Sequence, residues 1–141
     1  MSDESHAPPS PEELRLVEAA WAVRESAVCT YSGFAVGAAL ESADGRIWTG
    51  ANVENASYNL GSCAERVALF HALTHGGSDF RRVVVVTDTP KPTSPCGACR
   101  QILLEFAPEA TVIMVAREGL VARVRVTDLV PYAFDASSLE Q

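Results

Sequence analysis

The chain has 141 residues and a formal net charge of -7, since 18 acidic side chains outnumber 11 basic ones. This length fits one domain with one hydrophobic core. The negative charge repels a phosphate backbone, so we do not expect a nucleic-acid polymer as a substrate. No apolar run is long enough to cross a membrane, and the first residues, MSDESHAPPSPEE, do not have the pattern of a secretion signal. We therefore expect a cytoplasmic protein, in which cysteines stay reduced and serve as metal ligands or catalytic groups.

The N-terminal part is expected to form a disordered tail over residues 1–10 and then a helix from Pro11 to about Cys29. This helix opens a single domain that spans residues 11–141. A proline at a first-turn position, followed by two glutamates, is typical of a helix start. Apolar residues then recur near helical spacing and predict the inner face of the helix: Leu14, Val17, Ala20, Trp21 and Val28.

Two short strands are predicted in AVGAALESADGRIWTGANV, because the Asp44-Gly45 pair is a strong hairpin turn. The polar, glycine-containing stretch ENASYNLGS is typical of a loop. A second helix is expected to begin at Cys63 and to end at Gly76-Gly77.

The C-terminal half alternates between strands and a helix. RRVVVVTD is the kind of apolar run that forms a strand buried on both faces, whereas TPKPTSP cannot hold regular structure. A third helix is expected to begin near Cys96 and to end before Pro108. TVIMVA is typical of a further strand, and VARVRV alternates as an edge strand does. The order of elements predicts an α/β fold, a mixed sheet with helices packed on both faces.

Three of the cysteines are candidate zinc ligands. Cys96 and Cys99 are three positions apart, so in a first helical turn their sulfur atoms point the same way and can occupy two corners of a tetrahedron. Cys63, at another predicted helix start, can supply a third ligand if the two helix N-termini meet. The positive ends of the helices lower thiol pKa values. Arg66 is placed to offset the remaining negative charge of three thiolates around Zn²⁺.

Three protein ligands leave the fourth zinc position open, as in catalytic sites, and water bound there becomes acidic. Glu65 follows Cys63 by two residues, and its longer side chain can reach that water, take its proton and later hand the proton to a leaving group. Other interpretations stay open. The cysteines could form a disulfide, Cys29 could complete a closed structural zinc site or be a buried small hydrophobe, and Glu65 could only interact with the helix dipole.

Four motifs together resemble the small, homotetrameric-type cytidine deaminases, a family of zinc-dependent nucleoside deaminases: YSGFAVGAAL, NVENASY, CAER and PCGAC. The resemblance covers roughly Pro11 to Phe134. It implies a three-layer α/β/α sandwich with a mixed five-stranded sheet, and one Zn²⁺ per subunit held by Cys63, Cys96 and Cys99. It also implies hydrolysis of cytidine or deoxycytidine to the uridine product and ammonia. Zinc-bound hydroxide would attack C4 of the base while Glu65 carries protons to N3 and to the departing amine.

The same resemblance assigns substrate contacts. Asn52 and Glu54 would hydrogen-bond the sugar hydroxyls, and Phe34 would pack against the pyrimidine ring. Without the resemblance, the asparagine would be assigned to a loop turn and the phenylalanine to the core. Ala64 is assigned as a further substrate-binding residue. In a homotetramer whose pockets borrow residues from other subunits, borrowed contacts are expected at Ala56, Tyr58 and Phe134, the last of which could also serve simple packing.

Departures from the family pattern leave the preferred nucleoside open. Asn59 stands where glycine is common, and Ala35 where proline or lysine is frequent. His71 and His75 lie beyond the first turn of the second helix and are expected to be structural or solvent-facing. Two alternative functions remain: deamination of another aminopyrimidine nucleoside, such as a nucleoside antibiotic, and a non-catalytic zinc-stabilised module that binds a partner protein.

Overall fold

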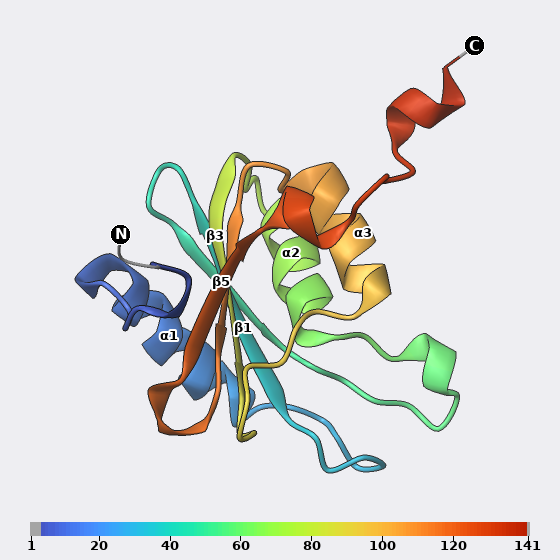
Figure 1. Cartoon of the computed structure of the whole chain (residues 1–141). Coiled ribbons are helices and arrows are strands. Elements are labelled where there is room, and N and C mark those ends of the chain that lie inside the picture. The colour runs from blue at the N-terminus through green and yellow to red at the C-terminus, as the bar shows by residue number, and fades with distance from the viewer. Residues whose placement is uncertain (1–3, 141) are drawn as a thin grey trace.

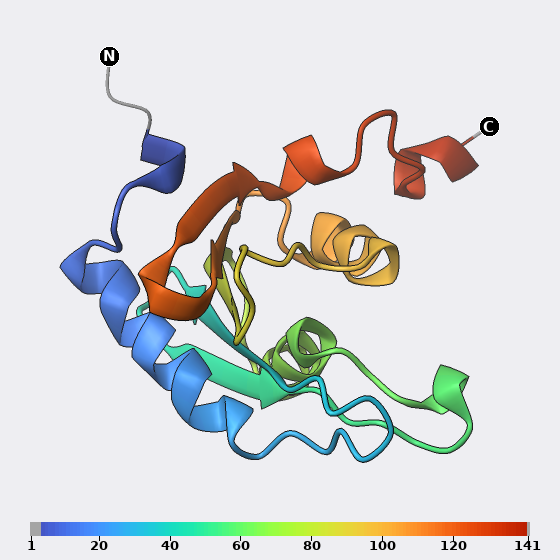
Figure 2. The same cartoon turned by 60° about the horizontal axis from the view of Figure 1, so that its bottom comes forward.

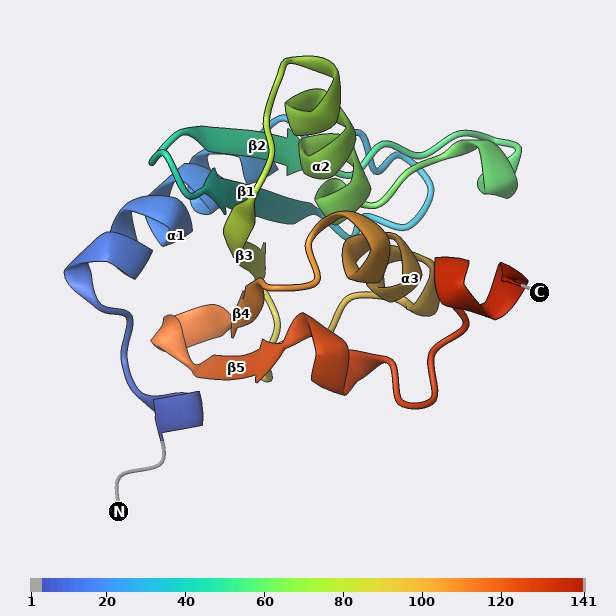
Figure 3. The same cartoon turned by 90° about the horizontal axis from the view of Figure 1, so that it is seen from above.

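In a computed structural model of the chain, which describes residues 4–140, a five-stranded sheet lies between helices on its two faces (Figure 1). Helix α1 covers one face, and α2 and α3 lie side by side on the other (Figure 3). The expected three-layer α/β/α sandwich with a mixed five-stranded sheet is therefore confirmed. The main elements are α1 (Pro11–Arg24), β1 (Val36–Ser42), β2 (Ile47–Ala51), α2 (Ala64–Thr74), β3 (Phe80–Thr87), α3 (Gly97–Phe106), β4 (Thr111–Val115) and β5 (Val121–Arg125).

The strand order in the sheet is β2-β1-β3-β4-β5. The β3–β4 pair is parallel and joined through α3, and the other neighbouring pairs are antiparallel. The hairpin between β1 and β2 turns at Asp44-Gly45, where Gly45 has a φ of +88° that favours glycine. As predicted, VARVRV forms an edge strand, β5.

The core has two layers, one on each face of the sheet. Val84 and Val86 of β3 pack with α1, whereas Val83 and Val85 of the same strand pack toward α2 and α3. Because successive side chains of a strand point to opposite faces, a strand covered on both sides must be apolar throughout. This explains the unbroken apolar run in β3. Within residues 4–140, no helix has the length and apolar composition needed to cross a membrane.

Helix α1 is shorter than the sequence predicts, and the expected end near Cys29 is wrong. The helix stops at Arg24, and Val28, which was assigned to the inner helical face, is 47% exposed. The backbone of Val28 pairs instead with the chain after β2, since Val28 N donates to Asn52 O and Glu54 N donates to Val28 O. This pairing brings the segments around residues 28–34 and 52–60 together at one end of the molecule (Figure 2).

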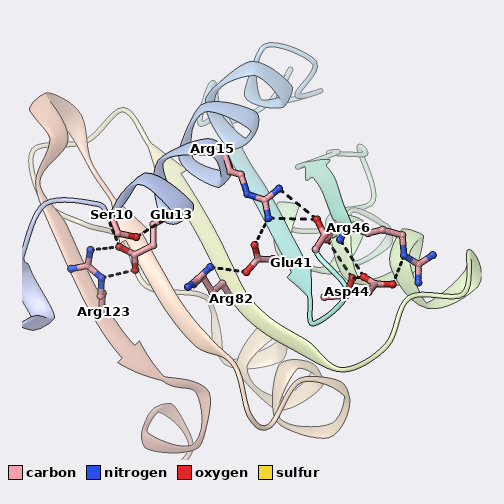
Figure 4. A network of polar contacts seen from close by, with 10 residues as sticks. Ser10, Glu13, Arg15, Glu41, Asp44, Arg46, Arg82 and Arg123 are labelled. Atoms are coloured by element: carbon pink, nitrogen blue, oxygen red, sulfur yellow. Dashed lines mark hydrogen bonds and ion pairs between the residues drawn. The ribbon is translucent and has the colours of Figure 1, made fainter.

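The segment before α1, residues 4–10, belongs to the part of the chain that the sequence analysis assigned to a tail. Residues 4–10 run beside β5, where the guanidinium of Arg123 donates to the backbone oxygens of Glu4, Ala7 and Pro8. Ser10 then caps α1 in a reciprocal capping box with Glu13, whose carboxylate pairs with Arg123 (Figure 4). These side-chain bonds from a distant strand order the segment. Residues 1–3, also assigned to the tail, lie outside the described residues.

Candidate metal centre and active-site cavity

Helices α2 and α3 begin next to each other, and each begins with a cysteine. Cys63 and Cys96 are the N-cap residues, and their Sγ atoms are 3.6 Å apart. Cys99, in the first turn of α3, brings a third sulfur, so that all three Sγ atoms lie within 4.8 Å of one another. Zinc–sulfur bonds of about 2.3 Å in a tetrahedron place sulfur atoms about 3.8 Å apart. The three thiols therefore fit a zinc ion, and the two helix starts meet as the sequence analysis required.

The thiols of Cys63 and Cys99 differ in pKa and in burial. The Cys99 thiol, which is fully buried, and the Arg66 guanidinium donate to Cys63 Sγ, and they lower the pKa of Cys63 to about 5. The pKa of Cys99 is raised by this donation and by burial. Arg66 Nη2 lies 3.6 Å from Cys63 Sγ, while its Nε is buried and has no acceptor among residues 4–140. The lowered pKa favours the thiolate form of Cys63, and Arg66 places a cation beside it.

Cys29 is not part of this cluster. It is partly exposed and lies at the segment that follows α1, outside the group of sulfur atoms. A closed site with Cys29 as the fourth ligand therefore does not form, and the alternative assignment of Cys29 as a fully buried hydrophobe is also wrong. The four cysteines are free thiols, so the structure contains no disulfide among its described residues.

Glu65 stands in the first turn of α2, beside the sulfur cluster, and is only 5% exposed. Burial raises the pKa of its carboxyl group, and the negative charge of Cys63 raises it further. A carboxyl group with a raised pKa can both accept and release a proton near neutral pH. Glu65 lines the same cavity as Cys63 and Cys96, so its carboxyl group lies next to the cysteine cluster.

The cavity at Glu65 has a volume of about 230 Å³. Phe34 and Ala64 belong to its wall, as do three residues that the sequence analysis did not identify: Thr87, Thr93 and Ser94. Thr87 lies at the end of β3, and Thr93 and Ser94 lie in the loop before Cys96. The only sign in the sequence that these residues line the cavity is that they precede the Cys96–Cys99 motif. A neighbouring cleft of about 440 Å³, lined by Tyr31, Tyr58 and Arg66 among others, is larger but excludes Glu65. The smaller cavity is the one that holds the reactive groups.

Asn52 and Glu54 line both the cavity at Glu65 and the neighbouring cleft. The side chains of both residues form hydrogen bonds with backbone atoms. Asn52 is 9% exposed; its amide donates to Phe34 O and accepts from Val36 N, each at 2.8 Å. One amide N–H and one oxygen lone pair remain available. The Glu54 carboxylate accepts from the Ser32 hydroxyl and from the backbone N–H groups of Ser32 and Tyr31, which lower its pKa. Both side chains thus hold the loop that carries Phe34.

The remaining candidate contacts lie away from the cavity at Glu65. Ala56 is exposed, and Tyr58 is 80% exposed with its ring edge-on to Tyr31. Phe134 is 63% exposed in the C-terminal segment beyond α3 (Figure 3). None of the three lines the cavity within its own chain.

Asn59 and Ala35, the two positions that depart from the family pattern, both lie in ordered backbone. Asn59 lies in a short 3-10 helix and has no positive φ, so its backbone does not need glycine. The carbonyl of Ala35 accepts a hydrogen bond from Arg24 Nε at 3.0 Å. His71 and His75 pack edge-on to each other toward the end of α2, and His71 also contacts Trp48. These histidines are not among the cavity residues.

Comparison with known proteins agrees with this geometry. Residues 11–115 match the family model described as the cytidine and deoxycytidylate deaminase zinc-binding region. A cytidine deaminase of Halalkalibacterium halodurans is 45% identical over 125 residues, covering 88% of this chain and 95% of the relative. The crystal structure of cytidine deaminase from Burkholderia pseudomallei superposes with a TM-score of 0.83 and 48% identity, covering 86% of this chain and 98% of that one. The cytidine deaminase structure from Mycobacterium tuberculosis has a TM-score of 0.74 and 36% identity, covering 86% and 96%.

The family match includes Cys63, Cys96 and Cys99, whose sulfur atoms the fold brings together as a zinc-binding triad. The matched region and the relatives each extend over most of the chain. The chain therefore belongs to the zinc-binding cytidine and deoxycytidylate deaminase family.

Proposed function

We propose that this protein is a zinc-dependent hydrolase that deaminates cytidine, deoxycytidine or both, giving the uridine product and ammonia. The observation that carries the proposal is one cavity in which a buried carboxyl group, Glu65, lies beside the three-cysteine cluster. A structural zinc site has no need of an ionisable group buried next to its ligands. The relatives named cytidine deaminase support the choice of substrate.

Cys63, Cys96 and Cys99 hold the zinc ion in this proposal, and Arg66 offsets part of the charge of the thiolates. A zinc ion held by these three residues would act as a Lewis acid and would lower the pKa of a water molecule in the remaining ligand position. Glu65 takes a proton from the attacking water and delivers it to N3 of the pyrimidine. It then takes the second proton from the hydroxyl group that has formed on C4 and transfers it to the exocyclic nitrogen, which leaves as ammonia while C4 becomes a carbonyl carbon. The raised pKa of Glu65 suits both directions of transfer.

The substrate is held by the walls of the cavity. We assign the pyrimidine ring to the space between Phe34 and the floor at Ala64, because both line the cavity at Glu65. Asn52 and Glu54 bind the sugar hydroxyls with the amide N–H and the oxygen lone pairs that the backbone bonds leave free. Binding through sugar hydroxyls selects a nucleoside over a free base.

The complete site is assigned to a homotetramer in the cytoplasm. Ala56, Tyr58 and Phe134 are exposed and do not reach the cavity of their own chain, so we assign them to pockets of neighbouring subunits. Exposed aromatic side chains of this kind are typical of subunit contacts. A reducing compartment keeps the three zinc ligands as thiols.

The proposal is tested by metal analysis and a deamination assay on the same purified sample. We expect one zinc per chain and turnover of cytidine or deoxycytidine, measured as the loss of cytosine absorbance and as ammonia released. Turnover of another aminopyrimidine nucleoside alone would support the analogue-deaminase alternative. Bound zinc without turnover of any of these would support the non-catalytic module, and a lack of zinc would refute the metal centre itself.

A further inference from the structure

Arg100 joins three separate parts of the chain near the metal centre. It lies on α3, one turn after Cys96. Its Nε donates to Pro95 O at 2.8 Å, its Nη2 donates to the hydroxyl of Ser94, and its Nη1 donates to Leu129 O at 3.3 Å. A planar guanidinium with five N–H donors can satisfy such a set of acceptors, which a lysine cannot.

The bond to Pro95 acts on the next residue, Cys96. The carbonyl of Pro95 and the N–H of Cys96 belong to one planar peptide unit, so a bond that fixes the oxygen also fixes the plane from which the cysteine side chain projects. Pro95 is buried, and its carbonyl requires a partner. Arg100 Nε supplies the shorter of two bonds to this oxygen, at 2.8 Å against 3.4 Å from the Ser94 hydroxyl, and thereby restrains the backbone at a metal ligand.

The loop before Cys96 is held by side-chain bonds: Thr89 Oγ1 donates to Lys91 O at 2.7 Å, and the Thr93 hydroxyl lies 3.3 Å from the hydroxyls of Thr87 and Thr89. Among residues 4–140, no backbone–backbone hydrogen bond holds residues 90–95. The loop also contributes Thr93 and Ser94 to the cavity wall. At its other end, Arg117 pairs with Asp88 at 2.7 Å, but this exposed pair lies eight residues before Cys96 in the chain. These threonine bonds end at Thr93, whereas the side-chain bonds of Arg100 hold Ser94 and Pro95, the two residues next to the ligand.

We propose that Arg100 is a positioning residue, which holds the Pro95–Cys96 peptide and the Ser94 hydroxyl so that the Cys96 sulfur is pre-oriented for zinc. This inference rests on the proposed function only in taking zinc as the bound ion. Groups that orient metal ligands commonly change metal affinity by about 10- to 100-fold when they are removed. The bond to Leu129 extends the restraint to the segment that leads toward Phe134.

The test compares zinc affinity in three variants of the full-length protein. In Arg100→Met the side chain keeps its length but loses its donors, and we expect zinc to bind about 10-fold or more weakly in competition with a chromophoric chelator. Arg117→Met is the matched control, because it removes an arginine that pairs with Asp88 at the far end of this loop. It should leave zinc affinity within about twofold of the wild type, since its bonds do not reach Cys96.

Arg100→Lys distinguishes the effect of the donor geometry on zinc affinity from the effect of the positive charge. It also tests the positioning role if Arg100→Met does not fold. Lysine keeps the charge but not the fork of donors, so affinity should stay well below that of the wild type. The thiolate-to-metal bands of the cobalt-substituted protein should shift in both Arg100 variants and not in Arg117→Met. Wild-type affinity in Arg100→Lys, or equal loss in Arg117→Met, would overturn the positioning role.

The outcomes also distinguish this inference from the proposed function. A wild-type protein that binds zinc but deaminates no nucleoside would refute the proposed function, while the affinities of the variants would still decide the role of Arg100. Deamination by the wild type together with unchanged zinc affinity in both Arg100 variants would refute the positioning role alone. A wild-type protein that binds no zinc would refute both.

Discussion

Glu65 shows how the fold changes the chemistry of a single side chain. A glutamate in a first helical turn ordinarily lies in water beside the positive end of the helix, which favours its charged form. In this structure the carboxyl group is buried beside Cys63, and burial raises its pKa. The same residue that would otherwise serve the helix dipole is thereby suited to exchange protons.

Replacing Glu65 by glutamine tests the proton-transfer role directly. The amide keeps the shape of the side chain but cannot accept the proton, so kcat should fall by about 10³-fold while zinc content and the circular dichroism spectrum stay the same. Glu105→Gln, an exposed glutamate on α3, is the matched control and should keep wild-type turnover. Near-normal turnover in Glu65→Gln would mean that another group moves the proton.

Among the site residues, the sequence identified those that carry a characteristic spacing. Cys63, Cys96 and Glu65 were found because their positions relative to helix starts and to one another are local properties of the chain. Ser94 and Arg100 lie next to the cysteine motif in the chain, but this proximity does not indicate what their side chains bind. Their importance depends on which backbone atoms lie near them after folding, and this is set by long-range contacts.

At the scale of elements, close contacts determine where the helices sit. A Cβ at Gly50 of β2 would lie 2.4 Å from the backbone N of Ala68, so only glycine allows α2 to approach the strand this closely. This contact fixes α2, and with it the position of Cys63 at the start of the helix. The hairpin therefore contributes to the metal centre although no residue of β2 touches it.

The junction between α1 and β5 depends on the ion pair of Glu13 and Arg123, two side chains that are 13% and 14% exposed. The bonds from Arg123 lower the pKa of Glu13 from 4.5 to about 2. The folded state therefore binds this proton less tightly than the unfolded state. The resulting stability is complete above about pH 4.5 and is lost as the pH falls toward 2.

Glu13→Gln should lower the free energy of unfolding at pH 7 by about 1–2 kcal/mol, which is less than the full equivalent of the pKa shift because solvent partly screens the pair. The difference between wild type and variant should shrink as the pH falls from about 4.5 to 2. Urea unfolding at a series of pH values measures both quantities. Glu12→Gln, at an exposed neighbouring position, serves as the control and should change stability little. A difference that stays constant with pH would exclude the ion pair as its source.

At the scale of the whole molecule, the C-terminal segment extends beyond α3, away from the sheet (Figure 1). It is attached to the helix through Gln101, which donates to Phe134 O at 2.6 Å, and through Arg100. The Phe134 side chain is left exposed, as are Tyr132 and Leu139. An exposed apolar segment on a fixed support is suited to contact another subunit.

Complementation between two impaired variants tests this arrangement. Phe134→Ala should lower kcat/KM by about 10-fold or more, because a buried aromatic contact contributes roughly 1.5–3 kcal/mol. After unfolding and refolding together, Phe134→Ala chains and Glu65→Gln chains should recover part of the wild-type activity, since one chain supplies Glu65 and its neighbour supplies Phe134. Light scattering should give the mass of four chains. No recovery in an assembly that contains both variants would assign Phe134 to its own chain.

The sequence by itself determined the types of the main elements, the ligand set and the family pattern, because hydrophobic period, helix starts and motif spacing are encoded over short stretches. Only the tertiary structure decided the end of α1, since Val28 pairs with Val53, and the course of residues 4–10, since Arg123 holds them. It also decided the walls of the cavity. These features depend on contacts between residues far apart in the chain, whose free energy can override a local pattern.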